Sequence, residues 1–305
     1  MAGTSPAMTA EKRFAAEEQR LQLIWPWQDR TRRFSVLKAG TFALMFVPAI
    51  WLVDQVAGGE FGPVPLGGMT YWSGFWATAI LLLALAITPA SAIFGWRRLI
   101  IVRRVIGVTA LAYAMAHIVI YFALRFWNFA FIAHEMASRL SLIVAAASTI
   151  GLIALGATSV DAAVRRMGAK GWQRLQSAVY ATTALAILHY LLSPGLFPDQ
   201  FLLSGAFFWL MTWRVLERRG HGANAGALAL LALASCLFTA AFEVGSIWAF
   251  RGYALSEIFS IYFTPILGIP PPWTILTLGL LLSGAAFARQ ALRSGVAGVD
   301  AGKIG

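Results

Sequence analysis

Long apolar segments follow one another along almost the whole chain, and short polar segments separate them. Each apolar segment has about the 17 to 25 residues that a helix needs to cross the hydrocarbon core of a bilayer. The pattern predicts an all-α, polytopic integral membrane helix bundle of about eight transmembrane helices. These segments lie near residues 38–56, 72–95, 105–124, 140–157, 174–192, 200–216, 225–248 and 273–291.

The composition supports a membrane protein and excludes two other classes. Hydrophobic residues make up 59% of the chain and charged residues 12%, whereas a soluble domain carries charges on about a quarter of its residues. A water-soluble enzyme is therefore excluded. The single cysteine, Cys236, cannot form a disulfide within the chain, so a disulfide-stabilised scaffold is excluded as well.

The net charge of +11 follows the predicted topology rather than a nucleic-acid surface. All but three of the 24 Lys and Arg residues fall in alternate polar segments, on one side of the predicted membrane. The three others are Arg125, Arg139 and Arg251. Because positive residues accumulate in cytoplasmic segments, both termini are expected in the cytoplasm, and no nucleic-acid partner is expected.

Two of the four histidines lie inside predicted helices at similar depths. His117 is 13 residues beyond Arg104 and His189 is 15 beyond Arg174, so they lie ~20 and ~22 Å from the cytoplasmic edge at 1.5 Å per residue. Two histidines on different helices at one depth are suited to ligate one haem iron from opposite faces. The alternative is two unrelated histidines, hydrogen-bonded to helix carbonyls or to neighbouring Thr and Tyr side chains.

The motifs around these histidines resemble a known family. They are Arg103-Arg104-Val105-Ile106-Gly107 with Tyr113, His117 and Tyr121, then Thr158-Ser159, Arg165-Arg166-Met167-Gly168, Trp172, Leu175, Tyr180 and His189-Tyr190. Further matches are Pro26-Trp27-Gln28-Asp29-Arg30, Arg33-Phe34-Ser35 and Thr88-Pro89. Over roughly residues 24–216 the chain is similar to the haem-binding membrane subunits of the periplasmic methionine-sulfoxide reductase system, which belong to the ferric-reductase-like transmembrane family.

The resemblance implies a b-type haem subunit of the bacterial inner membrane. Such a subunit transfers electrons from a cytosolic flavin reductase, or from a membrane quinol, to a periplasmic molybdenum-containing reductase, and it transforms no substrate itself. The expected organisation has three parts. Residues 1–36 form a basic cytoplasmic tail, residues 37–218 a six-helix haem-binding transmembrane domain, and residues 219–305 a two-helix membrane extension with a short cytoplasmic tail.

The chain departs from the family pattern at two histidine positions. Gln176 stands where the family pattern Trp-x-x-Leu-His ends, and Tyr71 stands at a family histidine near the start of the second helix. A glutamine amide is a poor iron ligand, so His117 and His189 remain as the metal ligands of one haem. A second carrier is then needed near the cytoplasm, either an FMN on the basic inner loops or a membrane quinol.

Two further residues are candidates for holding the haem. Arg125 is eight residues beyond His117, about 12 Å towards the outside, and is our candidate partner for a haem propionate; the alternative is an arginine that extends from a helix end to the interface. Tyr121 lies one helical turn beyond His117, on the same face of the helix. We therefore assign His117, His189, Arg125 and Tyr121 to the predicted cofactor site.

Two alternative functions stay open at this stage. One is a ferric-chelate reductase that passes electrons directly to a metal chelate at the outer face, without a protein partner. The other is a redox-silent membrane scaffold that has lost its haem sites, an alternative favoured by the replaced histidines at Tyr71 and Gln176.

Overall fold

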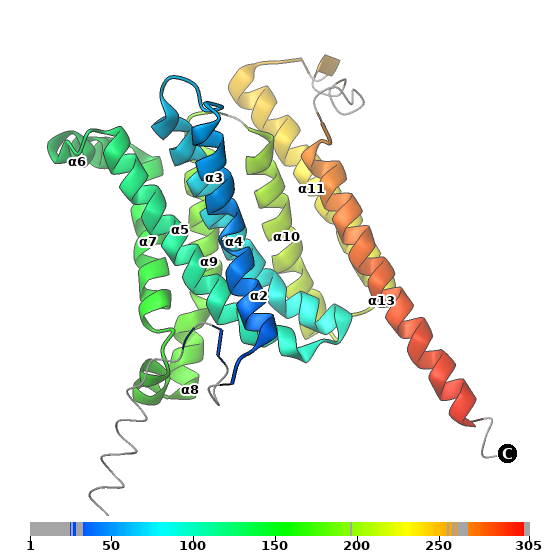
Figure 1. Ribbon diagram of the computed structural model, residues 1–305. Helices are drawn as coiled ribbons and strands as arrows, with labels where there is room; N and C mark the ends of the chain where they lie inside the picture. Colours follow the sequence, from blue (N-terminus) through cyan, green and yellow to red (C-terminus); the bar gives the residue numbers. More distant parts are fainter. Residues whose placement is uncertain are drawn as a thin grey trace, which may run out of the picture.

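The computed structural model consists of helices joined by short loops (Figure 1). The residues that it describes are 25, 27–28, 33–195, 197–254, 256–257, 260 and 268–301. Most of the predicted tail, residues 1–36, therefore lies outside the described residues. The helices are α2 (Val36–Leu44), α3 (Val47–Ala57), α4 (Pro65–Phe94), the 3-10 helix η1 (Arg97–Val102), α5 (Arg103–Leu124), α6 (Phe129–Ser138), α7 (Leu140–Ala157), α8 (Asp161–Ser177), α9 (Val179–Leu192), α10 (Pro198–Arg218), α11 (Ala225–Arg251) and α13 (Pro271–Ala301).

The prediction of an all-α polytopic membrane protein is confirmed. Among the described residues, seven helices or pairs of consecutive helices are long and apolar enough to cross a membrane. They correspond to seven of the eight predicted spans. The remaining predicted span, residues 200–216, corresponds to α10, which is long enough to cross a membrane but more polar than most of the other helices. Two of its residues, Gln200 and Trp213, are almost completely buried. Neighbouring helices rather than lipid surround this part of α10, so the helix needs a less apolar sequence than its neighbours.

The boundaries of α4 follow from two residues with special backbone properties. Pro65 occupies the start of the helix, where a backbone N–H would have no partner within the helix, so the missing N–H of proline costs no hydrogen bond. Gly95 ends it with a φ of +69°, a conformation that glycine adopts without the strain of a side chain. The guanidinium of Arg289 on α13 binds the last carbonyls of α4, those of Ala92 and Ile93. α13 is thus attached to the C-terminal end of α4.

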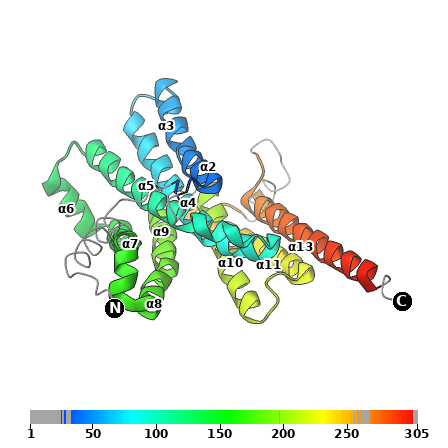
Figure 2. The ribbon, with the colours of Figure 1, turned by 60° about the horizontal axis from the view of Figure 1, so that its bottom comes forward.

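The core of the bundle forms around α4, which is the most buried of the membrane-spanning helices. It packs against α3, α5, α9, α10 and α13. α7 packs against both α5 and α9, whereas α5 and α9 make little direct contact with each other. α4, α5, α7 and α9 therefore form a ring in which α5 and α9 occupy opposite corners. α11 and α13 pair with each other on the far side of α10 (Figures 1 and 2).

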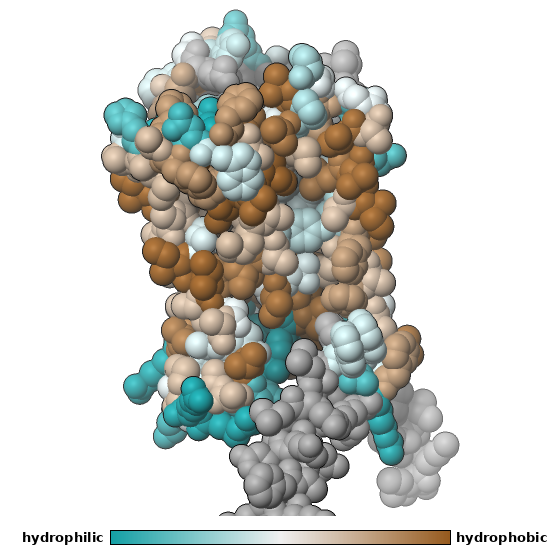
Figure 3. Space-filling model, turned by 60° about the vertical axis from the view of Figure 1, so that its left-hand side comes forward, coloured by the Kyte–Doolittle hydropathy of each residue, from teal (hydrophilic) through white to brown (hydrophobic). Residues whose placement is uncertain are grey.

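The two ends of the bundle carry different short elements. One end carries η1, α8 and the start of α2, and the opposite end carries α6 (Figure 1). Hydrophilic side chains gather towards both ends, and a largely hydrophobic band lies between them (Figure 3). Between the predicted spans 105–124 and 140–157 the structure has a further helix, α6, which Asn128 caps by accepting a hydrogen bond from the backbone N–H of Phe131.

Candidate functional site

The structure brings the two predicted histidine ligands together. His117 lies on α5 and His189 on α9, at opposite corners of the four-helix ring. The centroids of their rings are 6.4 Å apart, and the ring planes form an angle of 68°. Both side chains are half-buried. Two residues that are separated by 72 positions in the sequence therefore form one pair inside the bundle.

Each ring is oriented through its Nδ1 atom. His117 Nδ1 lies 2.9 Å from the carbonyl oxygen of Thr70 and 3.2 Å from Ser73 Oγ, and His189 Nδ1 lies 2.8 Å from the carbonyl oxygen of Ser141. A carbonyl oxygen only accepts hydrogen bonds, so Nδ1 carries the proton and donates it. The lone pair then lies on Nε2 of both rings. This tautomer, fixed by a backbone carbonyl, is typical of histidines that bind a metal through Nε2.

The pair fits an iron atom that brings its own equatorial ligands. Metal–imidazole bonds of about 2 Å on both sides, together with the half-width of each ring, place the two centroids about 6 Å apart, close to the observed 6.4 Å. Among the described residues, no group of three or more His, Cys, Asp or Glu side chains could hold a metal ion. Two histidines alone are too few for a bare ion, whereas a haem needs only two axial ligands from the protein.

One glycine makes room for the first histidine. A Cβ atom at Gly74 of α4 would lie 3.0 Å from Cε1 and 3.1 Å from Nδ1 of His117. The His117 ring therefore lies directly against the backbone of α4, where it reaches the carbonyl of Thr70. A larger residue at position 74 would therefore push the His117 ring away from α4.

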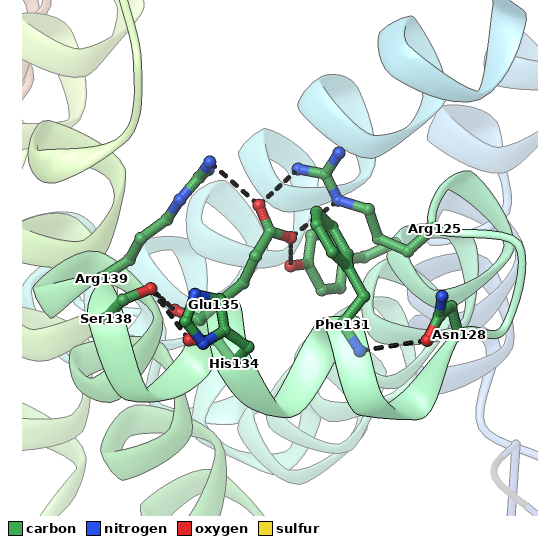
Figure 4. A network of polar contacts seen from close by, with 8 residues as sticks. Arg125, Asn128, Phe131, His134, Glu135, Ser138 and Arg139 are labelled. Atoms are coloured by element: carbon green, nitrogen blue, oxygen red, sulfur yellow. Dashed lines mark hydrogen bonds and ion pairs between the residues drawn. The ribbon is translucent and has the colours of Figure 1, made fainter.

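Arg125 binds a carboxylate of the chain (Figure 4), and Tyr121 binds the same group. Arg125 forms an ion pair with Glu135, at 2.9 Å between Nε and Oε2, and its Nη2 donates to Oε1 at 3.1 Å. Arg139 pairs with the same carboxylate at 2.9 Å, and the hydroxyl of Tyr121 donates to Oε2 at 2.7 Å. Glu135 is only 3% exposed. A haem propionate would have to share Arg125 with Glu135, so its assignment as a propionate partner stays a prediction.

The residues at the two replaced histidine positions have other partners. Gln176 donates through Nε2 to the carbonyl of Leu155 at 3.2 Å and to Oγ1 of Thr158 at 3.3 Å, and so closes the C-terminal end of α7. The hydroxyl of Tyr71 donates to the carboxylate of Asp199 at 2.6 and 2.5 Å. Both side chains thus use their polar atoms within the protein.

Comparisons with known proteins show to which family the chain belongs. Residues 73–187 match the family model of the ferric reductase like transmembrane component. The protein-methionine-sulfoxide reductase heme-binding subunit MsrQ of Azospira oryzae is 33% identical over 195 residues, which cover 63% of this chain and 84% of that protein. This chain belongs to the MsrQ family. The sequence resemblance to these subunits is therefore confirmed.

The chain is also similar to a second MsrQ protein and to a magnetosome protein. The MsrQ of Caulobacter vibrioides is 33% identical over 176 residues, which cover 57% of this chain and 84% of that protein. The magnetosome protein MamZ of Paramagnetospirillum magneticum is 30% identical over 188 residues, 59% of this chain but only 29% of MamZ. No solved structure matches the chain. The ferric-reductase-like model includes His117 and ends two residues before His189, so α10, α11 and α13 lie beyond it.

Proposed function

We propose that this chain is a b-type haem subunit that transfers electrons across the bacterial inner membrane to a periplasmic methionine sulfoxide reductase. The observation that carries the proposal is the pair His117 and His189, with centroids 6.4 Å apart and both Nδ1 atoms bonded to carbonyls. The family relationship supports it, because the MsrQ relatives are heme-binding subunits of that reductase system by name.

The chain's own residues would hold the haem in a fixed geometry. His117 and His189 would hold the iron through Nε2, and the carbonyls of Thr70 and Ser141 orient both rings for this. A haem held there supplies one-electron transfer. One haem is proposed per chain, since Gln176 and Tyr71 are bonded to other groups.

The position of the histidines also determines what else the electron path needs. His117 lies 14 residues from the start of α5 at Arg103, about 21 Å from the inner end at 1.5 Å per residue. This distance favours a second carrier on the inner side, either FMN on the basic segments η1 and α8 or a membrane quinol. The donor is then a cytosolic flavin reductase or the quinol itself, and both termini face the cytoplasm.

The acceptor can be tested with the purified protein in lipid nanodiscs. The haem is reduced with a stoichiometric amount of dithionite, and its reoxidation is followed optically after addition of a purified periplasmic molybdenum-containing reductase and a methionine sulfoxide. We expect reoxidation only when both are present. A suitable control is His134→Ala, because His134 is an exposed histidine on α6 that we place outside the haem site. Its reoxidation rate should equal that of the wild type.

A ferric-chelate reductase is the second candidate, and the match of residues 73–187 to the ferric reductase like model favours it. The same experiment separates the two functions. Rapid reoxidation by a ferric chelate, with no response to the reductase and its substrate, would identify the chain as a chelate reductase and contradict our first proposal.

A further inference from the structure

A carboxylate at the start of α10 joins α4 and α9 beside the histidine pair. Asp199 accepts hydrogen bonds from the hydroxyl of Tyr71 on α4, at 2.6 and 2.5 Å, and from the hydroxyl of Tyr190 on α9, at 2.5 Å. The rings of the two tyrosines lie 5.8 Å apart. Tyr190 is buried and Asp199 is half-buried. Three helices therefore meet at one carboxylate.

Both tyrosines are next in sequence to residues of the candidate haem site. Tyr71 follows Thr70, whose carbonyl accepts the hydrogen bond from His117, and Tyr190 follows His189 itself. Asp199 is thus connected to each candidate ligand through one tyrosine. The next residue, Gln200, is 1% exposed, and its side-chain amide donates to the carbonyl of Tyr190 at 3.0 Å. The start of α10 is consequently bound to α9 at two successive positions.

The hydrogen bonds to Asp199 are of the strong kind. None of the ion pairs among the described residues includes Asp199, and the two phenol groups are the side chains that bind its carboxylate. Short O–H···O⁻ bonds to a charged acceptor are roughly twice as strong as bonds between neutral groups. Because Tyr190 is buried and both phenols bind the same carboxylate, the three groups should hold one arrangement.

We infer that Asp199 is a positioning residue that fixes α4 and α9 at one separation and so sets the spacing and relative angle of the two imidazole rings. The inference rests on the proposed haem function. His117 takes its orientation from α4, through Thr70, and His189 is carried by α9. Any change in the relation between these helices at the level of Asp199 must change how the two rings face each other.

The test uses electron paramagnetic resonance of the full-length ferric protein, because the largest g value of a bis-histidine haem depends on the angle between the imidazole planes. The planes are 68° apart, so the wild type should give a strongly anisotropic low-spin signal. We expect Asp199→Ala and Tyr190→Phe to shift the largest g value, and Asp199→Glu, which keeps a carboxylate, to restore most of the wild-type signal.

A matched control is Tyr113→Phe. Tyr113 lies on the same helix as His117, and its hydroxyl donates to the carbonyl of Met45 at 2.8 Å, away from Asp199. The variant loses one phenol hydrogen bond of comparable length and should leave the g value unchanged. Asp199→Asn adds a second readout: loss of a negative charge should raise the midpoint potential, since that charge favours the ferric state.

The inference is overturned if Asp199→Ala, Asp199→Asn and Tyr190→Phe all retain the haem with the wild-type g value. If Asp199→Ala holds no haem, the g values of Asp199→Asn and Tyr190→Phe decide whether the inference stands. Failure of the proposed function looks different, because a wild-type protein without haem, or a His117→Ala variant with an unaltered signal, would contradict the site itself rather than the role of Asp199.

Discussion

Replacing Gly74 by alanine places one methyl group against the ring of His117. The new Cβ would lie 3.0 Å from Cε1 and 3.1 Å from Nδ1, whereas ordinary contacts begin at 3.4 Å. The ring must therefore retreat by about 0.4 Å, close to the tolerance of about 0.5 Å within which a functional group works. The displacement also acts on the 2.9 Å hydrogen bond from Nδ1 to the Thr70 carbonyl.

The cost of this substitution should fall mainly on the haem-bound protein. Without haem the His117 ring can shift within the limits of its hydrogen bond to Thr70, whereas a bound iron would also fix its Nε2 atom. Adding a methyl group to a well-packed site costs about 1 to 3 kcal/mol. Since each 1.4 kcal/mol is a factor of ten in affinity, we expect Gly74→Ala to weaken haem binding between about 5-fold and about 150-fold.

The assay is a titration of haem into the haem-free variant in nanodiscs, followed at the Soret band. Gly67→Ala serves as the control, because Gly67 lies on the same helix and a Cβ there meets no atom within 4 Å. It should bind haem as the wild type does. Equal affinity of the Gly74→Ala and Gly67→Ala variants would refute the placement of His117 as an iron ligand against α4.

Four further substitutions have distinct expected results. Glu135→Ala should lower the free energy of unfolding by about 1 to 3 kcal/mol, because Tyr121 and Arg125 lose hydrogen bonds to a buried carboxylate. Asp161→Ala, at an exposed ion pair, should cost at most about 1 kcal/mol, and thermal unfolding in detergent compares the two variants. Arg289→Met should lower the unfolding temperature without changing haem content, since it removes the bonds between α13 and the end of α4. Gln176→Ala should leave the pyridine-haem stoichiometry unchanged, and a loss of haem there would show that Gln176 belongs to the site.

The depth of the histidines was predictable, but their orientation was not. Counting residues from Arg104 and Arg174 places His117 and His189 at one level, because helix rise is the same for every sequence. The groups that orient the rings are backbone carbonyls of Thr70 and Ser141. Every residue has such a carbonyl, so no side-chain pattern could single these two out.

Two carboxylates of structural importance had no clear signal in the sequence. Glu135 lies between two predicted spans, and its burial depends on α6 folding against α7. Asn128 at a helix start was the available local indication. Asp199 contacts Tyr71 across 128 positions of the sequence, and hydrophobic periodicity cannot predict such a pair. Local patterns gave the helices, whereas polar contacts between helices required the structure.

The most direct test of the central claim is the pyridine-haem stoichiometry of the purified protein beside the His117→Ala and His189→Ala variants, with His134→Ala as control. We predict about one b-type haem per chain in the wild type and in His134→Ala, and its loss in either of the other two variants. A wild-type protein without haem, or haem that persists in both His117→Ala and His189→Ala, would contradict the account.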